Sequence, residues 1–262
     1  MKKILALLYG VFAYVFFFIT FLYAIGFVGN VFVPKSIDTG KTAALPEAVV
    51  IDAVLLSLFA LQHSIMARRG FKARLTRVVS WHVERSTFVV AASAVLALLL
   101  WQWRPIPDNI WDVRGTVLGS VLGVAFWIGW GILLISTFLI NHFELFGLQQ
   151  VWAYARGSEF HRPDFKAPAL YRLVRHPIYL GFVVAFWSAP VMTAGHLLFS
   201  VATTGYILVG IFFEERDLIA EYGKIYGEYR SRVPMLLPFL KFKRQSQGDR
   251  ETSDVQTRTA GV

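Results

Sequence analysis

Residues 178–213 form an unbroken run of 36 residues without a single Asp, Glu, Lys or Arg. As one helix this run would be about 54 Å long, whereas the apolar core of a bilayer is only about 30 Å thick. Pro190 and Gly195 lie near its middle and favour a turn there. We therefore predict a helical hairpin, with a first segment over residues 178–192 and a return over residues 197–213. The pattern leaves open whether the hairpin crosses the membrane or enters it and returns.

Four further apolar runs precede this hairpin. They cover residues 4–33, 47–67, 86–103 and 115–140. Each is long enough to cross a bilayer as a helix, and the first is too long for the core of a signal peptide. With 56% hydrophobic and only 16% charged residues, the chain is too apolar for an ordinary soluble domain. We therefore predict an all-α integral membrane protein with about four transmembrane helices plus the C-terminal hairpin, which adds two further membrane segments.

The charged residues between these runs predict the orientation of the chain. Lys and Arg dominate residues 68–85, residues 141–177 and the segment after residue 213. Residues 34–46 and 104–114 carry few or balanced charges. Because basic connections remain in the cytoplasm, we expect both termini at the cytoplasmic face. This bias also accounts for the net charge of +9 without a nucleic-acid partner.

The same patterns predict one multi-pass domain over residues 1–240. Its N-terminal spans occupy residues 1–140, and the part that binds a cofactor occupies residues 168–240. Residues 241–262 are polar and without periodicity, so we expect a disordered tail. The chain has no Cys, and its six His show no tight ligand spacing. We therefore predict no disulfide, no Cys nucleophile and no bound metal.

The fourth run carries a regular glycine pattern. Gly115, Gly119 and Gly123 recur at a spacing of four residues. Small residues at this spacing let two membrane helices approach closely. We expect this face to pack against another helix and to take no part in chemistry.

Polar side chains crowd on both sides of the hairpin. The segment before it reads Tyr171-Arg-Leu-Val-Arg175-His176-Pro177-Ile-Tyr179-Leu-Gly181. Pro177 suits a first helical turn and disfavours helix at His176, so His176 is expected to cap a helix. Such a helix start, next to Arg175, binds carboxylate or phosphate, and Gly181 leaves room for a close approach. A basic residue that merely marks the membrane boundary would give the same sequence.

Two adjacent carboxylates, Glu214 and Glu215, follow directly after the hairpin. The hairpin would bring them to the same face of the membrane as Arg175 and His176. A carboxylate pair opposite these cationic groups suits a zwitterionic ligand that carries an ammonium and a carboxylate. An exposed pair would instead be an ordinary feature of a helix end.

Together these segments resemble the membrane methyltransferases of the isoprenylcysteine carboxyl methyltransferase and phospholipid methyltransferase superfamily. The matching residues are Arg175-His176-Pro177-x-Tyr179-x-Gly181, Glu214-Glu215, Gly223, Tyr226, Tyr229, Arg232-Val233-Pro234 and Pro238. The resemblance implies S-adenosyl-L-methionine as the cofactor. It implies that Glu214 meets this cofactor with Glu215 beside it. The other expected cofactor-binding residues are Tyr171, Arg175, His176, Pro177, Tyr179 and Gly181.

Three upstream segments resemble the methanethiol S-methyltransferase group within that superfamily. They are Gln62-His63-Ser64-x-Met66-Ala67-Arg68, Trp81-x-x-Glu84-Arg85 and Asn141-His142-Phe143-Glu144-Leu145-Phe146-Gly147-Leu148. This resemblance implies methylation of methanethiol to dimethyl sulfide. Prenylcysteine enzymes have an Arg four positions before the acidic residue, where this chain has Gly210. The difference argues against a prenylcysteine carboxylate as the substrate.

A thiol acceptor must lose its proton before or during in-line methyl transfer. His63 and His142 are the candidate bases because each lies near the cytoplasmic end of a predicted span, with Glu144 as a possible orienting partner. Either His could instead be an interfacial side chain satisfied by backbone or water. Asp52 is a further candidate, since a carboxylate inside a span is functional by default. It could equally lie at the outer boundary, because Pro46 precedes it closely.

Other functions remain open at this stage. The same fold could methylate another thiol, a phospholipid amine or a prenylcysteine carboxylate. A non-enzymatic membrane assembly factor or small-solute carrier is the alternative of a different class. We expect the partners to be a small volatile thiol and the lipid bilayer, and we infer no obligate protein partner. The sequence does not fix the oligomeric state.

Overall fold

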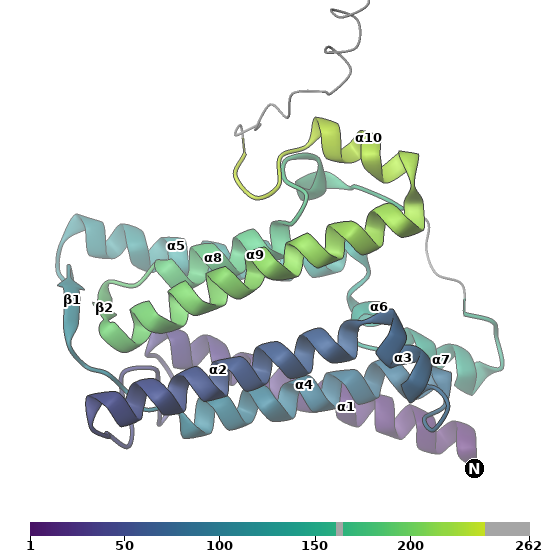
Figure 1. Ribbon diagram of the computed structural model, residues 1–262, viewed down its shortest axis with the longest axis horizontal. Coiled ribbons are helices and arrows are strands. Elements are labelled where there is room, and N and C mark those ends of the chain that lie inside the picture. Colours follow the sequence, from purple (N-terminus) through teal and green to yellow (C-terminus); the bar gives the residue numbers. More distant parts are fainter. Residues whose placement is uncertain (161–164, 239–262) are drawn as a thin grey trace, which may run out of the picture.

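The computed structural model describes residues 1–160 and 165–238, and within these ranges the chain is almost entirely helical (Figure 1). Five of its helices are long and apolar enough to cross a membrane: α1 (Lys2–Gly29), α2 (Leu45–Ala67), α4 (Trp81–Gln102), α5 (Val117–Ile140) and α9 (Ala194–Tyr222). The shorter helices are α3 (Arg69–Leu75), α6 (His142–Leu145), α7 (Leu148–Arg156), η1 (Ala169–Arg172), α8 (Pro177–Trp187) and α10 (Lys224–Arg232). The predicted all-α integral membrane fold is confirmed. The predicted tail, residues 241–262, lies outside the described residues.

The long helices form two layers (Figure 1). Helix α4 packs against both α1 and α2 in one layer, and α8 packs against both α5 and α9 in the other. Contact between α2 and α9 joins the two layers. The layers therefore meet in part along the two helices that carry His63 and the Glu214-Glu215 pair, and α1 also contacts α5 through Phe21 and Trp130.

The predicted hairpin is confirmed as α8, strand β2 (Val191–Thr193) and α9. Its first arm is shorter than expected because Pro190 disfavours helix just before it. Its second arm is longer, since residues 214–222 contain neither Gly nor Pro and continue the helix as far as Tyr222. Glu214 and Glu215 therefore lie within α9 rather than after it.

The tip of the hairpin lies at the far end of the bundle from these carboxylates. Strand β2 pairs antiparallel with β1 (Asn109–Asp112), which lies in the connection between α4 and α5. We call this the sheet end. The opposite end, formed by α3, α6, α7, α10 and the start of α1, is the basic end (Figure 1).

The glycine contact predicted within α5 is wrong in its position. A Cβ at Gly123 would meet nothing within 4 Å, and one at Gly119 would meet Val113 of the preceding connection. The close helix contact lies one to two turns further on, at Gly129. A Cβ there would lie 2.6 Å from the backbone nitrogen of Ala185, and one at Gly181 would lie 2.6 Å from the carbonyl oxygen of Gly129. The room that Gly181 provides is therefore filled by α5.

Candidate active site

Glu215 is the centre of a buried ion cluster at the basic end. Its Oε1 accepts a hydrogen bond from Arg175 Nε at 2.7 Å and lies 3.2 Å from His176 Nε2. Its Oε2 lies 2.9 Å from Arg230 Nε. Only 5% of Glu215 is exposed. A carboxylate this buried is tolerated because both of its oxygens have cationic or imidazole partners.

Arg175 links the start of α8 to the end of α10 and to the residues that follow α10. One terminal nitrogen of its guanidinium donates to the carbonyl oxygens of Arg230 at 3.0 Å and Val233 at 2.6 Å. Its backbone nitrogen donates to the carbonyl oxygen of Pro234 at 2.9 Å. The guanidinium was expected to bind an anionic ligand. In the structure it instead holds Glu215 and the backbone that follows α10.

Glu214 lies beside this cluster but has a different environment. Its side chain is 43% exposed, and its Oε2 lies 3.8 Å from Nδ1 of His176. This oxygen is buried and has no hydrogen-bond partner among the described residues. A buried acceptor without a donor is costly unless a ligand supplies one. The two adjacent carboxylates therefore differ: both oxygens of Glu215 are paired within the protein, whereas Oε2 of Glu214 is not, although the Glu214 side chain also interacts with Tyr179.

Tyrosines surround the two carboxylates. Tyr229 donates its hydroxyl to the carbonyl oxygen of Tyr171 at 2.6 Å, which links α10 to η1. The Tyr226 hydroxyl is buried and has no hydrogen-bond partner in the described chain, while Tyr179 lies next to Glu214. Burial raises the pKa of Tyr229 to about 12, with the Glu215 carboxylate adding to the rise and Arg175 opposing it. The tyrosines therefore remain neutral, and their ring faces suit a bound cation.

His63 on α2 lies at the junction of the two layers. Its ring centroid is 5.0 Å from that of Phe88 on α4, 5.4 Å from that of Phe59 and 6.5 Å from that of Tyr206 on α9. Its Nδ1 is buried and has no hydrogen-bond partner in the part of the chain described here. Tyr206 in turn influences Tyr179 electrostatically, as Glu214 does. Tyr206, which contacts His63, is therefore also an electrostatic neighbour of Tyr179 beside Glu214.

His142 occupies a different corner. Its Nε2 lies 2.9 Å from the hydroxyl of Tyr14 on α1, and its Nδ1 lies 2.9 Å from Oγ1 of Thr137. Its ring also stacks on Phe138 with centroids 4.3 Å apart. Burial lowers the pKa of His142. Both ring nitrogens are used to join α1 to the end of α5.

Glu144 was expected to orient His142. Its Oε2 instead accepts a hydrogen bond from the side-chain amide of Asn141 at 3.2 Å. Asn141 also exchanges hydrogen bonds with Gln149, both at 2.9 Å. Tyr14 and Thr137 already hold both nitrogens of His142. The structure therefore places Glu144 in the turn between α5 and α7.

Comparison with known proteins assigns this chain to a family. It is 56% identical to methanethiol S-methyltransferase 1 of Bradyrhizobium diazoefficiens over 237 residues, which covers 90% of this chain and 83% of that protein. It is 55% identical to the methanethiol S-methyltransferase of Mycobacterium tuberculosis over 239 residues, which covers 91% of this chain and 98% of that protein. The chain belongs to the methanethiol S-methyltransferase family.

Membership of the methanethiol S-methyltransferase family makes this protein a methyltransferase rather than a membrane assembly factor or a carrier. A more distant relative is Nurim of Danio rerio, 25% identical over 185 residues, or 68% of this chain and 67% of that protein. No protein-family model matches the chain, and no solved structure gives a significant match.

Three residues of this family member lie in or near the candidate site although the sequence did not single them out as site residues. Arg230 reaches Glu215 because the turn at Gly223 folds α10 back, and Gly223 has a left-handed φ of 54°. Tyr206 lies within the apolar run over residues 178–213. The sequence signal that could have identified it is its position two turns before Glu214 on the same helix. Ser64, in the first upstream segment, donates to Tyr206.

Asp52 lies at the sheet end, far from these residues. It is fully buried, and its Oδ1 accepts a hydrogen bond from the backbone nitrogen of Arg104 at 2.8 Å. Arg104 directly follows α4 at the sheet end. The structure therefore places Asp52 near the sheet end of α2, close to the end of the span.

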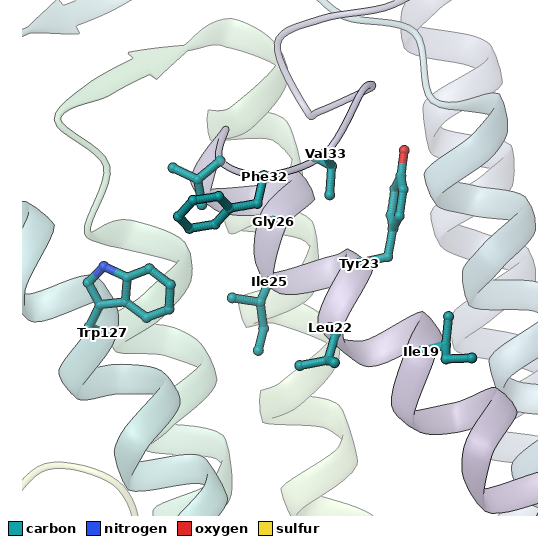
Figure 2. A pocket seen from close by; sticks show the side chains of 9 residues that line it. Ile19, Leu22, Tyr23, Ile25, Gly26, Phe32, Val33 and Trp127 are labelled. Atoms are coloured by element: carbon teal, nitrogen blue, oxygen red, sulfur yellow. The ribbon is translucent and has the colours of Figure 1, made fainter.

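An apolar groove also lies toward the sheet end (Figure 2). It is formed by the second half of α1, the turn after it and Trp127 of α5, and its lining includes Leu22, Tyr23 and Phe32. Among its lining residues only Tyr23 can ionise. In the described residues, no three side chains of the metal-ligating kind gather as a metal site would need. This groove therefore offers no carboxylate or imidazole that could take part in methyl transfer.

Proposed function

We propose that this protein transfers a methyl group from S-adenosyl-L-methionine to methanethiol and so forms dimethyl sulfide at the basic end. The observation that carries the proposal is the carboxylate pair on α9. Arg175, His176 and Arg230 saturate Glu215, and this arrangement holds the neighbouring Glu214 with a buried oxygen that lacks a donor. The relatives named methanethiol S-methyltransferase support the choice of acceptor.

The residues present fit S-adenosyl-L-methionine. When bound, this cofactor supplies a methyl group on a positively charged sulfur. Glu214 can accept hydrogen bonds from its ammonium group, and the first turn of α8, which lacks a side-chain cap, can bind its carboxylate. Tyr179 and Tyr226 offer aromatic faces to the sulfonium. The role of Glu215 is to fix α8, α9 and α10 around this position.

On the acceptor side we propose His63 as the base. Its Nδ1 is buried without a partner, so it is available to take the thiol proton. His142 is less suited because both of its nitrogens are already hydrogen-bonded. The rings of Phe59, Phe88 and Tyr206 around His63 form walls suited to a small apolar molecule. A volatile thiol partitions into the bilayer, which gives it a path to a site between α2 and α9.

We infer that the basic end faces the cytoplasm. It carries Arg69, Arg74 and Arg77 after α2 and Arg230 and Arg232 on α10. The sheet end carries the weakly charged connections. The asymmetry follows the positive-inside rule.

The test is dimethyl sulfide in the headspace above membranes that contain the protein, S-adenosyl-L-methionine and methanethiol. We expect product above that of empty membranes, lost in Glu214→Gln and retained in Arg74→Gln, an exposed position on α3. Binding of the cofactor is measured on the same membranes. No product with cofactor binding intact would overturn methanethiol as the acceptor and direct the search to another thiol, a phospholipid amine or a prenylcysteine carboxylate. Absent binding in a folded protein would overturn the cofactor site.

A further inference from the structure

Tyr206 stands between the two halves of the proposed active site. On one side, Ser64 Oγ on α2 donates a hydrogen bond to the Tyr206 hydroxyl oxygen at 3.2 Å. The Tyr206 ring also meets His63 edge to face, with centroids 6.5 Å apart. On the other side, Tyr206 is an electrostatic neighbour of Tyr179, which lies next to Glu214.

Contacts at the end of α2 locate Tyr206 along the length of the bundle. Arg68 forms an ion pair with Asp217 at 3.3 Å and lies over the ring of Phe213. Arg68 is one turn beyond Ser64, so both lie on the same face of α2. Asp217 is eleven residues after Tyr206, which places Tyr206 about 16 Å further into the bundle along α9. Tyr206 is half-buried there.

The direction of the Ser64 hydrogen bond leaves the Tyr206 proton unused by Ser64. A phenol has one O–H to donate and an oxygen that accepts. Ser64 supplies a proton to that oxygen, so the Tyr206 O–H is available for another acceptor. A hydroxyl that accepts a hydrogen bond is also a stronger donor, because such chains polarise one another.

We propose that the Tyr206 hydroxyl binds the acceptor sulfur and donates a hydrogen bond to the thiolate, and that Ser64 positions this hydroxyl. This inference rests on the proposed function, whose acceptor it places between His63 and Tyr179. A hydrogen bond to an anion is stronger than one between neutral groups. Tyr206 therefore favours the thiolate over the neutral thiol.

The step balances with the groups named. The thiol proton passes to Nδ1 of His63. A lone pair of the thiol sulfur forms the new carbon–sulfur bond. The electron pair of the bond that breaks stays on the sulfur of the methyl donor, which becomes a neutral thioether. Tyr206 keeps its own proton throughout and acts only as a hydrogen-bond donor.

Several charged or titratable groups face Tyr206 from neighbouring elements and bear on the pH dependence. His63 and Arg68 face it from α2, and Tyr179 faces it from α8. Glu214 lies further along α9, and Arg85 on α4 acts electrostatically on His63. A thiolate beside Tyr206 would be favoured by Arg68 and Arg85 and opposed by Glu214. Removing only the Tyr206 hydroxyl changes one donor and leaves these charges in place.

The experiment is steady-state kinetics with Tyr206→Phe in membranes, against Tyr23→Phe as the control. Tyr23 lies at the sheet end, where its hydroxyl donates to the carbonyl oxygen of Lys35 at 3.0 Å. We expect Tyr206→Phe to lower kcat/KM for methanethiol by about 10- to 100-fold, with cofactor affinity unchanged. The rise of activity with pH should move to higher pH, because the thiolate has lost a donor. Ser64→Ala should cause a smaller change in the same direction, and Ser64→Thr should restore the rate.

A more acidic acceptor of similar size separates this role from a structural one. With methaneselenol, which ionises more readily than methanethiol, the loss in Tyr206→Phe should shrink markedly. An equal loss for both acceptors with an unmoved pH profile would overturn the proposal, as would kinetics matching those of Tyr23→Phe. If the unsubstituted protein forms no dimethyl sulfide, the proposed function itself has failed.

Discussion

Glu214 and Glu215 are adjacent in the chain, yet the side chains around the two carboxylates differ. Glu215 is 5% exposed and is held by Arg175, His176 and Arg230. Glu214 is more exposed and keeps one buried oxygen without a donor. The difference arises because neighbouring residues on a helix point about 100° apart. The pair therefore allows a direct comparison of a carboxylate paired within the protein with the one proposed to bind the methyl donor.

Replacing each carboxylate by its amide should give opposite results. Glu215→Gln leaves two guanidinium groups without their anion and should lower the free energy of unfolding by about 3 kcal/mol. Glu214→Gln should leave unfolding nearly unchanged but weaken cofactor binding by about 10- to 100-fold, since a bond to an ammonium is lost. Thermal unfolding in detergent and cofactor titration measure the two effects. Equal losses of stability in both variants would contradict this assignment.

His142 predicts a pH dependence of stability. Burial lowers its pKa in the folded protein, so the unfolded chain binds its proton more readily than the folded one. Stability is therefore complete above the ordinary His pKa of about 6.5 and is lost as the pH falls through the lower folded value. The unfolding temperature should drop as the pH falls below about 6.5, and His142→Gln should reduce this drop. A drop of the same size in the variant would show that His142 is not responsible.

At the scale of elements, α5 and α8 depend on a close contact that leaves no room for a methyl group. A Cβ at Gly129 would lie 2.6 Å from a backbone nitrogen of α8, whereas one at Gly131 would meet nothing within 4 Å. Gly129→Ala should cost about 1–3 kcal/mol of stability because backbone must move. Gly131→Ala, on the same helix, should change it by less than about 1 kcal/mol, because Ala favours helix. Similar unfolding temperatures for both variants would contradict the contact.

The elements also show what the sequence could predict. The hairpin could be predicted because a run of 36 uncharged residues is too long for one helix to cross a bilayer. His176, Glu214 and Glu215 could be proposed as site residues because each lies in a short family motif. The partners Arg230 and Tyr206 escaped prediction because their contacts depend on how α10 turns back and how α9 meets α2. His142 resembled a base in sequence. Its partner Tyr14 is 128 residues away, and only the packing of α1 beside α5 brings the two together.

At the scale of the whole molecule, the two ends of the bundle differ in charge. The positive-inside rule then predicts that the basic end faces the cytoplasm. Because the sequence contains no Cys, a single introduced cysteine can be labelled selectively. Lys41→Cys in the connection after α1 should react with a membrane-impermeant maleimide in intact cells. Arg77→Cys at the basic end should react only after permeabilisation, and the reverse pattern would contradict the orientation.

The central claim is that Glu214 holds a methyl donor whose methyl group moves to methanethiol. The most direct test supplies membranes with S-adenosyl-L-methionine carrying a deuterated methyl group and with unlabelled methanethiol, and then determines the mass of the dimethyl sulfide released. The account predicts product with one deuterated and one ordinary methyl group, formed by the unsubstituted protein and by Gly131→Ala but not by Glu214→Gln. Unlabelled product, or labelled product at an undiminished rate from Glu214→Gln, would contradict it.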